Sequence, residues 1–172
     1  MRLALVIVGA ATVTTAVALA SPQTTPALLR LDGVGPLKLG MTRQAAVATG
    51  WLAHRSHGCE LGGKPYPITY RLDGPRAPST LRASAEFVDD RLRTLSFSAG
   101  ARTGLGIEPG RSTAAQMVTR YRAAGFSARS RYDSTFQGTF VTVRRNGATR
   151  IGGFAERGKL TILAIPGVSV CE

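Results

Sequence analysis

The chain has 172 residues and a formal net charge of +12, with 22 Lys and Arg against 10 Asp and Glu. This length is enough for one domain with a sizeable hydrophobic core. The basic residues are scattered and form no Lys/Arg block, which argues against a nucleic-acid-binding protein. The positive charge instead favours anionic polymers and acidic proteins as partners.

The N-terminus has the pattern of a secretory signal. Arg2 supplies a positive charge, residues 3–19 are almost all apolar or small, and A-L-A over 18–20 fits the site that signal peptidase reads. A retained membrane anchor is the alternative, because the apolar run is near the lower length limit for a span. We predict a signal peptide over 1–20, no transmembrane span after cleavage, and a secreted or cell-envelope location.

The rest of the chain is expected to form a single domain over 21–172. Two stretches begin and end alike, which indicates two tandem repeats, at about 31–99 and about 104–166, followed by a tail over 167–172. Half of such a domain would bury too little surface to be stable alone. We therefore expect the two repeats to share one sheet.

Each repeat contains one predicted helix. In the first, Thr42 is placed to cap a short helical pattern that ends at Gly50. In the second, Thr113 and Gln116 have the spacing of a capping box, and the pattern ends at Gly125.

Strands are predicted where apolar and polar residues alternate, and Asn146-Gly147 gives the strongest hairpin signal. These segments are 81–88, 91–98, 139–145, 148–154 and 159–165. The expected fold class is α+β, with two tandem helix-plus-antiparallel-hairpin repeats that share one antiparallel sheet and carry their helices on one face.

One segment resembles a known family. The run L-G-M-T-R-Q over 39–44 is similar to the G-M-T-x-x-x-V signature of β-lactamase-inhibitory-protein and outer-membrane-assembly-lipoprotein-like folds, and C-E-L-G-G over 59–63 resembles a run of the first family. The resemblance implies tandem helix-plus-sheet repeats and a protein-binding function. The second repeat departs from it with G-R-S over 110–112, so no interface residue of the family is transferred. Inhibition of a β-lactamase does not follow from such a fold.

The two cysteines, Cys59 and Cys171, are the only pair available in the chain. In an oxidising compartment an even cysteine count indicates a disulfide, worth about 2–4 kcal/mol if unstrained. Two separate buried thiols are the alternative.

Catalytic motifs are absent from the sequence. His54, His57 and Cys59 could in principle ligate a metal, but they lie in a glycine-containing loop and the cysteine is expected to be oxidised. No G-x-S-x-G elbow or phosphate-binding loop is present. We predict a non-enzymatic protein without a metal site or cofactor; the alternative is a hydrolase or metal enzyme, which would lose activity on substitution of His54 or His57.

A binding surface is predicted on the uncovered face of the sheet. If Phe154 points into the core as Phe87 does, pairing across the Asn-Gly turn turns Val141 and Val143 toward the helices. A register shifted by one residue would reverse these assignments. The candidate binding residues are Phe136, Phe140, Thr142, Arg144, Ile151 and, in the first repeat, Arg82.

The expected function is a secreted protein-binding module, an inhibitor of or accessory to an extracellular or envelope protein. The alternative is a basic envelope-associated factor that binds anionic wall or membrane polymers. The two differ in their response to salt, which weakens contacts between exposed charges far more than a buried aromatic contact.

Overall fold

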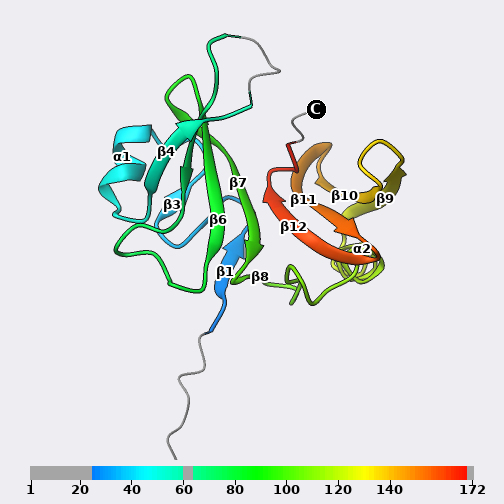
Figure 1. Cartoon of the computed structure of the whole chain (residues 1–172). Helices are drawn as coiled ribbons and strands as arrows, with labels where there is room; N and C mark the ends of the chain where they lie inside the picture. Colours follow the sequence, from blue (N-terminus) through cyan, green and yellow to red (C-terminus); the bar gives the residue numbers. More distant parts are fainter. Residues whose placement is uncertain (1–24, 60–63, 170–172) are drawn as a thin grey trace, which may run out of the picture.

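The computed structural model describes residues 25–59 and 64–169 (Figure 1). The predicted signal peptide, 1–20, and Cys171 lie outside the described residues. The described part of the chain is mostly β, with 49% strand and 11% helix. Two sheets, of four and eight strands, and two helices make up the described part of the chain. None of its helices has the length and apolar character needed to cross a membrane.

The eight-stranded sheet is antiparallel throughout and consists of two four-stranded meanders that meet at β7 and β12. Figure 1 shows the first meander in teal to green and the second in yellow to red. Across the sheet the strands are β4 (Ala53–His57), β5 (Ile68–Arg71), β6 (Arg82–Val88), β7 (Arg91–Ala99), β12 (Lys159–Ile165), β11 (Ala148–Glu156), β10 (Gly138–Arg145) and β9 (Ser127–Asp133).

The smaller sheet pairs the start of the described chain with a segment about seventy residues later. β1 is antiparallel to β2 and parallel to β8, whose Ala101 pairs with Ala27. Its strands are β3 (Leu37–Lys38), β2 (Gly33–Val34), β1 (Ala27–Arg30) and β8 (Ala101–Thr103).

The predicted α+β class with helix-plus-hairpin repeats is wrong. Each helix is followed by a four-stranded meander, not by a hairpin, and the small sheet was not foreseen. Its strands have only two to four residues, so they are too short to show a two-residue alternation. The partner of β1 is also remote in sequence, which local patterns cannot reveal.

The two predicted helices are present. Helix α1 (Arg43–Ala48) begins after Thr42, whose Oγ1 accepts a hydrogen bond from the Ala45 N–H at 3.2 Å. Helix α2 (Ala114–Ala123) begins with the full capping box of Thr113 and Gln116. The predicted capping residues therefore mark the first residue of each helix correctly. Their side chains accept hydrogen bonds from N–H groups of the first turn, which have no partner within the helix.

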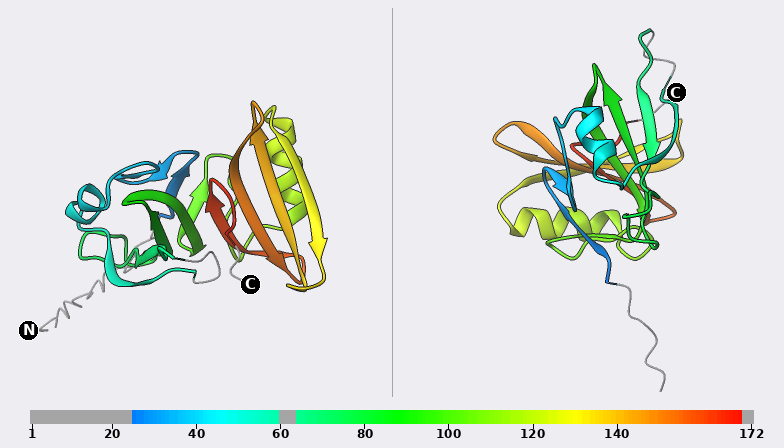
Figure 2. Two further views of the ribbon diagram at one scale, coloured as in Figure 1. Left: turned by 90° about the horizontal axis from the view of Figure 1, so that it is seen from above. Right: turned by 90° about the vertical axis from the view of Figure 1, so that its left-hand side faces the viewer.

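One face of the large sheet is covered and holds the core. Met117 and Tyr121 of α2 are buried against the second meander, and Leu29 and Val34 of the small sheet belong to the same continuous core. Figure 2 shows α2 along one side of β9–β12 and the small sheet beside β6 and β7. The opposite side of the large sheet is called the open face below.

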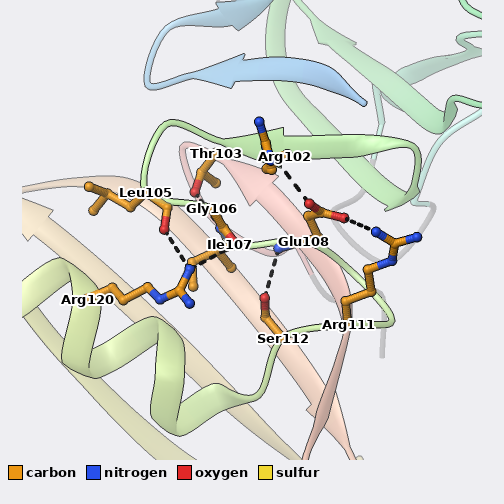
Figure 3. Close-up of polar contacts among 9 residues, drawn as sticks. All are labelled: Arg102, Thr103, Leu105, Gly106, Ile107, Glu108, Arg111, Ser112 and Arg120. Carbon is orange, nitrogen blue, oxygen red and sulfur yellow. Dashed lines mark hydrogen bonds and ion pairs between the residues drawn. The ribbon is translucent and has the colours of Figure 1, made fainter. Parts of the chain in front are cut away.

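The end of β8 and the loop that leads from it to α2 contain the two buried polar side chains of the described residues, Thr103 and Ser112 (Figure 3). Thr103 Oγ1 accepts from the Ile107 N–H at 3.1 Å, and Ser112 Oγ accepts from the Glu108 N–H at 3.0 Å. The Ser112 carbonyl also accepts from the Leu160 N–H at 2.9 Å. This segment thus connects the small sheet, α2 and β12.

Ion pairs and arginine hydrogen bonds at the surface also stabilise the segment between β8 and α2. The carboxylate of Glu108 lies 3.4 Å from Arg111 Nη1 and 3.9 Å from Arg102 Nε (Figure 3). Arg120 Nη1 donates to the Leu105 carbonyl at 2.9 Å and to the Gly106 carbonyl at 3.1 Å. These contacts join α2 to the loop that precedes it.

Replacing Ser112 with alanine should lower the free energy of unfolding by about 1–3 kcal/mol, because it leaves the Glu108 N–H without its acceptor. Urea denaturation of wild type and variant measures this loss. The control is Ser98→Ala, since Ser98 is exposed and only donates to the Arg82 carbonyl at 3.3 Å. Equal losses in the two variants would contradict the assignment.

Candidate functional site

The open face can be followed residue by residue across the sheet, because directly paired residues share a face. Ser84 pairs with Ser96, which pairs with Ala164 of β12. Ala164 pairs with Gly152 of β11, and that row continues through Thr142 to Arg129 at the edge. The row therefore consists of serine side chains in the first meander, of the small residues Ala164 and Gly152 in the middle, and of an arginine at the edge.

The middle of the open face is crossed by the C-terminal segment. A Cβ atom added at Gly152 would lie 2.6 Å from the Val168 backbone nitrogen, so the chain after Pro166 passes directly over this glycine. Ala164, on the same face, is fully buried. The small residues at the centre of the row thus make room for the crossing segment, which divides the open face into two halves.

The half over the second meander carries three aromatic rings. The rings of Phe136 and Phe140 are 5.6 Å apart, and those of Phe140 and Phe154 are 4.8 Å apart. We call Phe136, Phe140 and Phe154 the aromatic triad. A Cβ atom at Gly138 would lie 2.3 Å from Phe154 Cζ, so this glycine gives Phe154 its space. Phe154 is 8% exposed, whereas Phe136 and Phe140 are half-buried.

Arginines flank the aromatic triad on the edge strand. Arg131 pairs with Phe140 and Arg129 pairs with Thr142, so both side chains share the open face with the rings. The Arg131 side chain is 80% exposed and lies 3.3 Å from Asp133. A groove of roughly 720 Å³ is lined by these two arginines, by Phe136 and Phe140 of the triad, and by Val168. We call this the aromatic–arginine groove.

The half over the first meander is polar. A second groove, of roughly 360 Å³, is lined by Arg71, Arg82 and the serines of β6 and β7. Beside it Glu86 lies in a small cavity with Thr69 and Thr94, and burial raises the pKa of this carboxyl. The half of the open face over the first meander therefore carries hydroxyl groups and a carboxyl group, whereas the half over the second meander carries aromatic rings.

Of the two cysteines in the predicted disulfide, the structure describes only Cys59. Cys59 lines the small cavity that Ser169 also lines, and Ser169 precedes Cys171 by two residues in the sequence. Cys171 lies outside the described residues, so its pairing with Cys59 stays a prediction.

The structure places five of the six predicted binding residues on or beside the open face. Phe136, Phe140 and Thr142 line the aromatic–arginine groove, Arg144 lines the neighbouring cavity, and Arg82 lines the polar groove. The sixth, Ile151, was assigned wrongly.

Ile151 is 1% exposed and pairs with Val143 in the core. The cause is a bulge beside the Asn-Gly turn, where Arg144 pairs with Thr149 but Val143 pairs with Ile151. One extra residue in β11 inverts every face beyond it. Phe154 therefore lies opposite Phe140 on the open face and not in the core.

Sequence reasoning also missed Arg129 and Arg131. They lie on β9, whose sequence S-A-R-S-R-Y-D over 127–133 has no alternation of apolar residues. Such a strand is stabilised by pairing with β10, not by its own pattern. The alternation of arginines with serine and tyrosine is the signal that was available.

The histidines are apart from the aromatic–arginine groove. His54 Nε2 lies 3.8 Å from Asp73, its side chain 68% exposed, while His57 packs edge-on against Tyr66 at 6.3 Å. Among residues 25–59 and 64–169, no three His, Cys, Asp or Glu side chains are grouped to hold a metal ion.

No family model, curated protein or solved structure matches the chain. The resemblance to the β-lactamase-inhibitory-protein family stays a prediction.

The pKa of Glu86 predicts a pH dependence of stability. Burial raises this pKa above its ordinary value of 4.5, so the folded state favours the neutral carboxyl and is penalised as pH rises through the folded pKa. Glu86→Gln should therefore be more stable than wild type at about pH 7 and similar to it at about pH 3.5. Urea denaturation at both pH values tests this, with the exposed Glu156→Gln as control. A difference independent of pH would contradict it.

Proposed function

We propose that the chain is a non-enzymatic, secreted protein-binding module that uses its open face on an extracellular or envelope protein, as an inhibitor or accessory. The observation that supports this most is the aromatic triad. Phe136 and Phe140 are half-buried on a sheet face that no helix covers in the described part of the chain. Aromatic and arginine side chains are the residue types enriched at the centres of protein interfaces.

The triad has the physical properties of a binding anchor. The ring of Phe154 packs against Phe140 and against the backbone of Gly138, which has no side chain in the way. The ring therefore occupies its position before any partner binds. Rigid rings lose little conformational entropy when they are covered. Each square ångström of apolar surface removed from water contributes about 25 cal/mol. Phe136 and Phe140, the half-buried members of the triad, can therefore supply affinity that does not depend on charge.

The surroundings of the triad supply polar contacts and orientation. Arg129 and Arg131 flank it at the edge, and Arg71, Arg82 and the serines of β6 and β7 line the other half. An apolar centre with a polar rim is the usual anatomy of a specific interface. Planar guanidinium groups also bind carboxylates in a defined geometry.

The predicted disulfide fits this proposal. The C-terminal segment crosses the open face at Gly152, and Ser169 lies at the cavity of Cys59. A Cys59–Cys171 bond would hold this crossing segment in place and stabilise the surface, at a value of about 2–4 kcal/mol.

A second candidate function rests on the charge of the chain. The net charge is +12, and exposed arginines occur away from the groove as well, such as Arg111 at 81% side-chain exposure. A basic envelope factor held by anionic wall or membrane polymers would use these charges without the triad. Salt separates the two, because the screening length falls to about 3 Å at 1 M.

The test is capture of a partner from the culture medium and cell envelope of the source cells. A discrete protein should stay bound to wild type through a wash at about 1 M salt and be lost with Phe140→Ala. Because Phe140 is half-buried, this variant should lose less stability than Ile151→Ala, which removes a core side chain worth about 2–5 kcal/mol.

Leu28→Ala is the control, since Leu28 is 56% exposed on the small sheet, away from the aromatic–arginine groove. It should leave capture unchanged. Material that elutes with salt from wild type and Phe140→Ala alike would favour the charge-driven factor and contradict the binding module.

A further inference from the structure

The edge strand β9 is unusually open to pairing. It is the last strand of the eight-stranded order, and its pairing with β10 runs without a register shift from Asp133 to Ser127. The opposite edge, β4, is interrupted by a bulge between Ala53 and Ser56 and by the positive φ of His54. Natural proteins commonly use such irregularities to block edge pairing, and β9 lacks them.

One side-chain contact shows which backbone groups of β9 point outward. Arg122 Nε donates to the Ala128 carbonyl at 2.7 Å. Along an antiparallel strand, alternate residues direct both N–H and C=O to the same edge. We infer that Ala128, Ser130 and Tyr132 direct their backbone groups away from β10. Arg122 then donates to the first of these carbonyls, that of Ala128. The outward N–H and C=O groups of Ser130 and Tyr132 remain in position to pair with another strand.

The charges on β9 select the kind of strand that fits. Arg129 and Arg131 lie on the open face, at alternate positions. A second copy of the chain, added antiparallel about Ser130, would bring Arg129 opposite Arg131 of the other molecule, and like charges directly opposite are destabilising. A segment with acidic side chains at alternate positions would instead pair with both arginines. Charge complementarity therefore favours an acidic partner over self-association.

We propose that the partner supplies an extended acidic segment, which adds to β9 as a further strand. This inference rests on the proposed function, since the aromatic–arginine groove borders β9 through Arg129, Arg131 and Asp133. Backbone bonds to Ser130 and Tyr132 provide affinity, and carboxylates beside the arginines provide selectivity. The same partner reaches the aromatic triad from this edge.

The experiment uses a displayed library of random twelve-residue peptides selected on the whole chain. Enriched peptides should carry Asp or Glu at alternate positions. Ser130→Pro should weaken their binding at least about tenfold, because proline removes an outward N–H and is tolerated where that group faces solvent on an edge strand. Ser130→Ala keeps the N–H and should bind like wild type.

A charge-reversal variant decides the matter if the proline variant fails to fold. Arg129→Glu with Arg131→Glu should shift the enriched peptides from acidic to basic residues. Enrichment without acidic alternation, an empty selection, or equal binding by Ser130→Pro and wild type would overturn strand addition. Peptides lost with Phe140→Ala but retained by Ser130→Pro would leave the proposed function standing and remove only this inference.

Discussion

The pairing of β7 with β12 determines the rest of the structure. Only three residue pairs join the two meanders, Leu95 with Ile165, Ser96 with Ala164 and Phe97 with Leu163. Leu95, Phe97 and their two partners are fully buried, while Ser96 and Ala164 between them face the other way. Because side chains alternate along a strand, this junction sets the core and the open face of β7 and β12, and pairing extends that assignment across the sheet except where a bulge shifts it.

The two faces have different chemistry for this reason. The face that carries Phe97 and Leu163 is covered by α2 and the small sheet, so it excludes water and supplies the hydrophobic stabilisation. The face that carries Ser96 is crossed by the C-terminal segment near Gly152, and neither described helix lies on it. Phe136 and Phe140 keep part of their rings accessible on this open face, and that apolar surface is what another molecule could cover.

Local signals in the sequence predicted the elements better than their arrangement. Thr42 and Thr113 gave the helix starts, and Asn146-Gly147 gave the hairpin of β10 and β11. The fold class was wrong because the small sheet depends on β1 meeting β8, a pairing that no local pattern encodes. Propensity and alternation report on neighbours along the chain, while sheet composition depends on contacts between distant segments.

The candidate site was predictable only in part. Phe136 and Phe140 were assigned to the open face, but the bulge near Arg144 moved Ile151 into the core and brought Phe154 to the triad. The presence of a two-residue Asn-Gly turn does not predict a bulge, with its one extra residue, in the strand that follows the turn. The groove's arginines were not predicted because β9 has a single buried residue, Ala128, and owes its extended form to pairing with β10.

The most direct test of the open face as a binding surface is amide hydrogen exchange, measured on the chain alone and with the protein captured at high salt. We expect slower exchange in the partner complex across 127–145, which covers β9 and β10, and unchanged exchange in α2 over 114–123. Slower exchange in α2 or the small sheet, with none across β9 and β10, would contradict it.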